Sequence, residues 1–170
     1  MNRIICFLIF ATFFSSGLFS QELNQKYHDP SLDKEVLIGY CDLNGLRWGE
    51  FRTPMLETYE EYEGDEKVIN KIKDNWQDVK ITIVLASWCH DSKEQVPLFL
   101  NLLEETGYDN SNLTLIAVNR KKTAGDLDIS KLNIEKVPTM IFYRNNEELG
   151  RIIETPKTSL EKDTWKIIKN

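Results

Sequence analysis

The second half of the chain alternates apolar and polar residues in patterns that predict four strands. Residues 79–86 (VKITIVLA) are mostly apolar and β-branched, which is typical of a strand buried on both faces. Residues 113–119 (LTLIAVN) predict a second buried strand. Residues 139–143 and 149–154 predict two more, joined around an Asn-Asn pair that is typical of a hairpin turn.

Helical spacing of apolar residues occurs before, between and after these strands. One helix begins near residue 66, a second covers residues 92–106 with Pro97 inside it, and a third covers 159–169. The first and third are predicted to direct inward Val68, Ile69, Ile72, Trp76, Leu160, Trp165 and Ile168. Residues 121–136 are charged and mixed, and allow a short helix between loops. The order βαβα followed by ββα predicts an α/β fold with a central mixed sheet and helices on both faces.

The first twenty residues have the pattern of a signal peptide. Arg3 supplies the positive start, residues 4–14 form an uncharged apolar run, and small residues lead to a cleavage point after Ser20. The run is too short and too poorly flanked to predict a transmembrane helix, although a retained N-terminal anchor is the alternative. We therefore expect an exported protein, periplasmic or extracellular, with no membrane span after cleavage.

Residues 21–65 predict an N-terminal extension that packs on the core of a domain over residues 66–170. A short strand is expected at 36–40, followed by an amphipathic helix within 46–62 that Pro54 interrupts. Its apolar face is an aromatic stripe, interpreted as core packing rather than a ligand site, formed by Trp48, Phe51, Met55, Tyr59 and Tyr62.

Length, charge and cysteine content narrow the class of protein. The chain has 170 residues, a net charge of -6 and a pI near 5.1, which argues against nucleic acid or an anionic membrane surface as a partner. If the signal peptide is removed, Cys41 and Cys89 remain, and the sequence leaves open whether they form a disulfide. The spacing of the Cys and His residues matches no common zinc site, so neither a metal nor another cofactor is predicted.

Cys89 lies where the strand of residues 79–86 gives way to the helix that follows. Unpaired backbone N–H groups and the positive end of the dipole at a helix N-terminus favour thiolate over thiol. Lys93 adds a positive charge one turn later, and Asp91 opposes it. The alternative is a structural cysteine buried at the strand end, but Trp88 and the polar residues after Cys89 favour an exposed loop.

Three groups of residues together resemble the thioredoxin family. The first is Trp88-Cys89-His90-Asp91-Ser92-Lys93 with Pro97, where thioredoxins have W-C-x-x-C-K and a kinking proline. The second is Val137-Pro138-Thr139 and the apolar residues after it, which look like the family's cis-proline segment and strand. The third is the hairpin of residues 145–150. The resemblance covers residues 66–170 and, more loosely, extends to exported thioredoxin-like proteins of Gram-negative bacteria.

The resemblance implies a thioredoxin-like fold and a role for each matching residue. Cys89 would be the attacking thiolate, assisted by Ser92, and Trp88 and His90 would line the substrate-binding rim. Pro138, in a cis peptide, would lie across from Cys89, and Val137 would offer backbone groups to an extended partner chain.

Three departures from the family pattern change the expected chemistry. Ser92 replaces the resolving cysteine, and its hydroxyl cannot complete a disulfide, although it can donate a hydrogen bond to a thiolate. Ile83 stands six residues before Cys89, where thioredoxins bury an acid. His90 could carry a positive charge beside Cys89 and make a mixed disulfide more oxidising.

These features lead to three functional hypotheses. The first is single-thiol exchange with protein or peptide thiols and disulfides, or with low-molecular-weight thiols, as in isomerisation or deglutathionylation. The second is a peptide-binding module that has lost turnover. The third is a two-cysteine reductase in which Cys41 is the second thiol, although a buried inert thiol is the favoured interpretation of Cys41.

Overall fold

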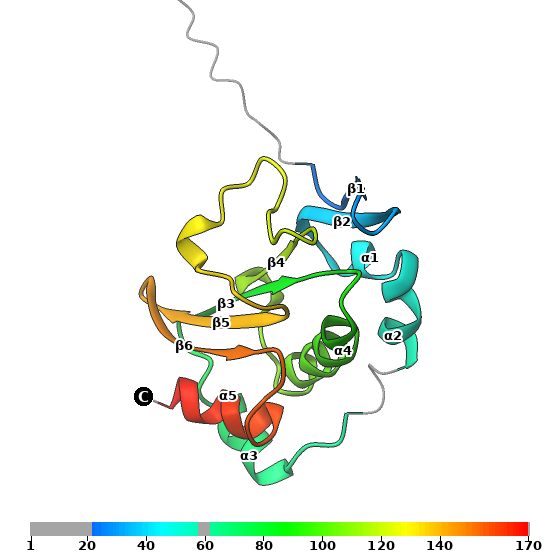
Figure 1. The fold of residues 1–170 in the computed structure, drawn as a ribbon. Helices are drawn as coiled ribbons and strands as arrows, with labels where there is room; N and C mark the ends of the chain where they lie inside the picture. Colours follow the sequence, from blue (N-terminus) through cyan, green and yellow to red (C-terminus); the bar gives the residue numbers. More distant parts are fainter. Residues whose placement is uncertain (1–21, 58–61, 170) are drawn as a thin grey trace, which may run out of the picture.

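A six-stranded sheet with the order β1-β2-β4-β3-β5-β6 forms the centre of the protein (Figure 1). The computed structural model describes residues 22–57 and 62–169. Within this sheet β3 and β4 are parallel, and the other neighbouring pairs are antiparallel. The strands are β1 Gln25–Asp29, β2 Lys34–Cys41, β3 Val79–Leu85, β4 Leu113–Ala117, β5 Thr139–Arg144 and β6 Glu147–Ile153.

One face of the sheet carries the main core. The α-helices are α1 Leu43–Leu46, α2 Arg52–Glu57, α3 Glu66–Lys73, α4 His90–Glu105 and α5 Leu160–Ile168, and the 3-10 turns are η1 Gly49–Phe51, η3 Asn110–Asn112 and η4 Ser130–Leu132. Each of these α-helices contributes buried side chains to a single cluster. Phe99 of α4 meets Phe142 of β5 edge to face in this cluster, with 5.9 Å between ring centroids.

The opposite face is covered by the loop between β4 and β5. Successive strand residues point to opposite faces, so Val84 and Ala86 belong to a second cluster with residues of this loop. The prediction of helices on both faces is therefore wrong for this side. Among the described residues, the loop that covers it contains one 3-10 turn, η4, and no α-helix. Positive φ angles at Lys122, Gly125 and Asn133 break the segment into turns. The fold class itself, a mixed α/β sheet flanked by helices, is confirmed.

The N-terminal segment extends the same sheet. The strand expected at residues 36–40 lies within β2, which pairs with β4 through Gly39 opposite Ala117 and Cys41 opposite Leu115. The sequence pattern did not predict β1, because four of its five residues are exposed and show no apolar alternation. The division of the chain at residue 66 stays a prediction.

The helix expected over residues 46–62 is broken into α1, η1 and α2. The break falls at Gly49, whose φ is +60°, and not at Pro54. Pro54 lies in the first turn of α2, where a missing N–H leaves no helical hydrogen bond unmade. Phe51 and Met55 are buried in the core as predicted, and Tyr59 lies outside the described residues.

The C-terminal elements follow their sequence patterns closely. Asn145 and Asn146, with φ of 53° and 64°, form the turn between β5 and β6, as two-residue hairpins with positive φ require. In α5 Leu160 and Ile168 are buried as predicted, whereas Trp165 is half-buried.

No helix in residues 22–57 or 62–169 combines the length and apolar character needed to cross a bilayer. The predicted signal peptide lies outside the described residues.

Candidate functional site

Cys89 occupies the junction of β3 and α4. A turn closed by the Cys89 N–H and the Ala86 carbonyl, 3.0 Å apart, carries the chain from the strand to the helix. Cys89 is the N-cap residue of α4, and its side chain is half-buried. The thiol therefore lies at a helix N-terminus, as predicted from the sequence pattern.

The thiol is in contact with the segment that precedes β5. The Cys89 sulfur donates to the Val137 carbonyl at 3.3 Å, across 48 residues of sequence. The Val137–Pro138 peptide bond is cis, and both residues are buried. The Pro138 carbonyl accepts the Glu154 N–H at 2.7 Å, so it is used within the fold. The Val137 carbonyl is likewise engaged, with the Cys89 thiol, and the predicted roles of Val137 and Pro138 toward a partner chain stay predictions.

Ser92 is turned toward the end of β3. Its side chain is fully buried, and its hydroxyl oxygen accepts the Ala86 N–H at 3.2 Å. No hydrogen bond between Ser92 and the sulfur of Cys89 occurs among the described residues, so the predicted donation to the thiol is absent here. Ser92 instead satisfies a buried backbone donor, which would cost about 1–3 kcal/mol if left unpaired.

Trp88 is held from two sides. Its indole N–H donates to the Val118 carbonyl at 3.0 Å, which ties the turn to the segment after β4. The Arg120 guanidinium lies 4.8 Å from the centre of the indole ring, in a cation–π contact. The backbone N–H of Arg120 donates to the carboxylate of Asp29 at 2.9 Å. Hydrogen bonds from the Ser31 hydroxyl and from Arg120 hold the pKa of Asp29 below its ordinary value.

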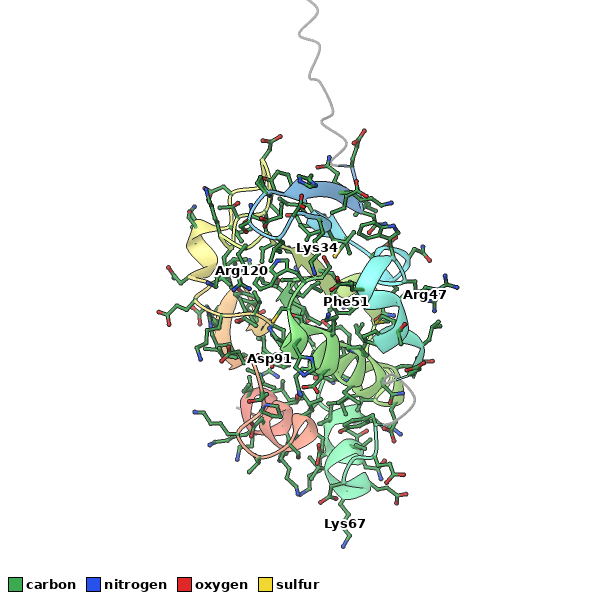
Figure 2. All side chains as sticks on the ribbon, turned by 45° about the vertical axis from the view of Figure 1, so that its right-hand side comes forward. Lys34, Arg47, Phe51, Lys67, Asp91 and Arg120 are labelled. Atoms are coloured by element: carbon green, nitrogen blue, oxygen red, sulfur yellow. The ribbon has the colours of Figure 1, made fainter. Side chains whose placement is uncertain are left out.

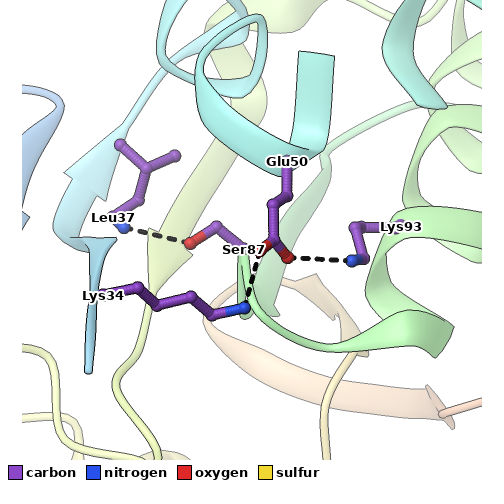
Figure 3. A network of polar contacts seen from close by, with 5 residues as sticks. All are labelled: Lys34, Leu37, Glu50, Ser87 and Lys93. Carbon is purple, nitrogen blue, oxygen red and sulfur yellow. Dashed lines mark hydrogen bonds and ion pairs between the residues drawn. The ribbon is translucent and has the colours of Figure 1, made fainter. Parts of the chain in front are cut away.

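The N-terminal segment braces the turn before Cys89 (Figure 3). The Ser87 hydroxyl accepts the Leu37 N–H of β2 at 3.0 Å. The Glu50 carboxylate bridges Lys34 at 2.7 Å and Lys93 at 3.2 Å. These two lysines, Lys34 first, hold the pKa of Glu50 below its ordinary value. The sequence pattern assigned the charge of Lys93 to Cys89, whereas the structure pairs it with Glu50.

His90 remains at the surface. Its side chain is 80% exposed, and its Nε2 atom lies 3.2 Å from the carboxylate of Glu94 one helical turn later. The predicted role of His90 at the substrate-binding rim stays a prediction.

A family model described as thioredoxin matches residues 50–165. The chain belongs to the thioredoxin family. The matched range begins before residue 66, so it includes part of the segment that the sequence pattern assigned to an extension. The proteins of this family act on protein thiols and disulfides.

Two curated relatives illustrate the similarity. Thioredoxin H9 of Arabidopsis thaliana is 25% identical over 118 residues, which cover 64% of this chain and 80% of the relative. The mitochondrial thioredoxin-2 of Schizosaccharomyces pombe is 35% identical over 77 residues, or 44% of this chain and 53% of the relative. Among solved structures, a protein of unknown function from Pseudomonas aeruginosa has a TM-score of 0.52 at 12% identity, over 69% of this chain and 81% of that one.

Cys41 does not reach the site of this thioredoxin-family member. It pairs with Leu115 of β4, which pairs with Ile83 of β3, so two strand spacings of about 4.8 Å each separate Cys41 from Ile83. Cys89 lies six residues beyond Ile83, past the end of the strand, whereas a disulfide requires Cα atoms within about 7 Å. Burial, and then the charge of Asp42, raise the pKa of the Cys41 thiol to about 12. Both cysteines are free thiols in this structure, and the role of Cys41 as a second thiol stays a prediction.

The core beneath Cys89 also differs from the usual thioredoxin arrangement. Ile83 is fully buried on the face that the α-helices cover, so an apolar side chain fills the position where the family buries an acid. Among the described residues, no group of three or more His, Cys, Asp and Glu side chains is placed to hold a metal ion.

Arg120, Asp29 and Glu50 are the residues of this site that the sequence reasoning missed. In the sequence, Arg120 belongs to a short basic run, Arg120-Lys121-Lys122, which is typical of a solvated loop. Its place near Cys89 could have been predicted, because Arg120 follows β4, which is parallel to β3. The carboxyl ends of parallel strands meet at one edge of a sheet. No comparable signal exists for Asp29 or Glu50, since their contacts span 91 and 43 residues.

Proposed function

We propose that this protein catalyses thiol–disulfide exchange through one nucleophilic thiol, that of Cys89. The observation that carries the proposal is that Cys89 and Ser92, the first and last residues of the Cys-His-Asp-Ser motif, have different environments. Cys89 is half-buried at the N-terminus of α4, whereas Ser92 is fully buried and engaged with Ala86. The first position can meet a substrate, and the second offers no thiol to complete a disulfide.

The reaction would proceed in two balanced steps. The Cys89 thiolate attacks one sulfur of a substrate disulfide, the substrate S–S bond breaks, and the departing thiolate takes a proton from water. An external thiol, or a second thiol of the substrate, then attacks the mixed disulfide and regenerates Cys89. The protein gains and loses no electrons over the cycle. Such chemistry fits isomerisation or deglutathionylation better than net reduction by the protein alone.

Trapping of mixed disulfides tests this proposal. The purified protein would be incubated with an oxidised protein substrate and quenched with acid, and the adducts would be resolved by intact mass. We expect adducts in the unmodified protein and in Cys41→Ser, because Cys41 is buried and distant, and none in Cys89→Ser. Cys41→Ser serves as the matched control for the loss of a thiol.

Other outcomes would change the conclusion. If the unmodified protein formed no adduct with any disulfide while still binding the substrate chain, the protein would be a binding module. If adducts formed but were released only when Cys41 was present, the two-cysteine hypothesis would return in spite of the burial of Cys41.

We further propose that the mature protein acts outside the cytoplasm. The apolar run of residues 4–14 behind Arg3, and the small residues before Gln21, support this part of the proposal. Expression of the full chain in a Gram-negative host, followed by fractionation and intact mass, tests it. We expect a periplasmic species that begins at or near Gln21. A full-length species in the cytoplasmic fraction would contradict export.

A further inference from the structure

We propose that Arg120 recognises a carboxylate on the substrate, close to the disulfide that Cys89 attacks. This inference rests on the proposed function and names a chemical class of substrate for the same site. The sequence offered only a short basic run, Arg120-Lys121-Lys122, whose default interpretation was a solvated loop. The contacts of Arg120 in the structure give it a more specific role.

Arg120 is stacked on the residue next to the nucleophile. Its guanidinium lies 4.8 Å from the centre of the Trp88 ring, and Trp88 directly precedes Cys89. The ring is itself fixed by its hydrogen bond to the Val118 carbonyl. Figure 2 shows Arg120 on the side of the molecule where α4 begins, which is marked by Asp91. A flat cation held on a fixed ring presents its N–H donors in a limited set of directions.

The charge of Arg120 is not neutralised within the protein. Its guanidinium forms no ion pair with any residue of 22–57 or 62–169. In contrast, Lys93 is paired with Glu50 and Lys136 with Glu154. The protein as a whole carries a net charge of -6, and Arg120 adds an unpaired positive charge against Trp88, the residue that precedes Cys89. It leaves N–H donors available to an external anion.

The backbone of Arg120 is anchored independently of its side chain. The Arg120 N–H donates to one carboxylate oxygen of Asp29, and the other oxygen accepts both the N–H and the hydroxyl of Ser31. Asp29 is buried at the end of β1. The position of the guanidinium is thus set by the β1–β2 hairpin and by Trp88, which reduces the ordering required when a ligand binds.

The chemistry identifies a carboxylate as the ligand, because an arginine binds a carboxylate through two parallel N–H···O bonds. Two sources can supply it beside a reactive disulfide: an acidic residue next to a cysteine in a protein, or the carboxylates of a small thiol such as glutathione. An ion pair at this exposed position is expected to be modest and sensitive to salt.

Two pairs of activated disulfides test the inference. The first pair consists of short peptides that differ only in Glu or Gln before their cysteine, each joined to 2-thiopyridine through a disulfide. Attack by Cys89 on the peptide sulfur forms the mixed disulfide and releases 2-thiopyridine, whose absorbance gives the rate. The second pair consists of glutathione and its diethyl ester, activated in the same way.

In the unmodified protein at low salt, we expect the acidic member of at least one pair to react about three to five times faster than its neutral counterpart. The ratio should fall to about one in Arg120→Gln and in about 0.5 M salt. Lys80→Gln is the matched control, because it removes the same charge at the opposite end of β3, and it should keep the ratio. Far-UV circular dichroism and urea denaturation, compared between Arg120→Gln and the unmodified protein, check that the fold is intact.

The outcomes separate the two proposals. A preference within the peptide pair assigns the carboxylate to a protein substrate, and a preference within the glutathione pair assigns it to a small thiol. Equal rates within both pairs, or a preference that survives Arg120→Gln, would overturn the role of Arg120 and leave single-thiol exchange standing. No reaction with any probe would overturn the proposed function together with this inference.

Discussion

Replacing Phe51 by alanine is expected to lower the free energy of unfolding by about 3–5 kcal/mol. Phe51 belongs to the 3-10 turn η1, outside the six strands, yet its side chain is fully buried in the main cluster (Figure 2). A cavity of that size in a closed core loses the transfer free energy of the ring and its packing contacts. Urea denaturation followed by tryptophan fluorescence measures the change.

The matched control for Phe51→Ala is Leu56→Ala. Leu56 lies in the adjoining helix α2, but its side chain is 54% exposed, so the truncation should change the stability by no more than about 0.5 kcal/mol. If Phe51→Ala lowered the free energy of unfolding as little as Leu56→Ala, the N-terminal segment would not share the core of the sheet. A separate unfolding transition at low urea in the unmodified protein, absent from Phe51→Ala, would likewise show that the N-terminal segment does not share the core of the sheet.

Ser92→Cys is expected to speed the release of substrate from the Cys89 adduct by at least about tenfold when no external thiol is present. The introduced thiol would lie one turn after Cys89 on α4, where residues three apart are neighbours. Its thiolate would attack the sulfur of Cys89, the substrate thiolate would leave, and the protein would retain an internal disulfide. The substrate gains the two electrons that the protein loses.

The control for Ser92→Cys separates the new thiol from the lost hydroxyl. Ser92→Ala also removes the oxygen that accepts the Ala86 N–H, but it adds no sulfur. Release from its adduct should therefore remain as slow as in the unmodified protein, at some cost in stability. Stopped reactions analysed by intact mass follow both the adduct and the internal disulfide. Equal release in Ser92→Cys and Ser92→Ala would contradict the expected geometry.

The sequence pattern was sufficient to predict the central part of the fold, because its signals are local. A β-branched apolar run gives β3, apolar residues at helical spacing give α4, and Cys89 lies between them. The Asn145-Asn146 pair specifies the β5–β6 turn through positive φ angles that asparagine tolerates. For each of these features, residues within a few positions of one another determine the backbone.

The surroundings of Cys89 depend on contacts that no local pattern contains. Lys93 meets Glu50 across 43 residues, and Arg120 meets Asp29 across 91. The pairing of β1 is set by its neighbour β2 rather than by its own largely exposed residues. The covering of one sheet face by a loop instead of a helix follows from a few positive φ angles, such as that of Asn133.

The most direct test of single-thiol exchange is the fate of the Cys89 adduct in the unmodified protein. The adduct would be formed with a substrate in which one disulfide joins two separate chains that carry no other thiol. It would be freed of excess reagent and of the released chain, and followed by intact mass with and without glutathione. We expect the adduct to persist without glutathione and to be released at a rate proportional to the glutathione concentration. Rapid release without any external thiol, together with an internal disulfide in the protein, would contradict the account.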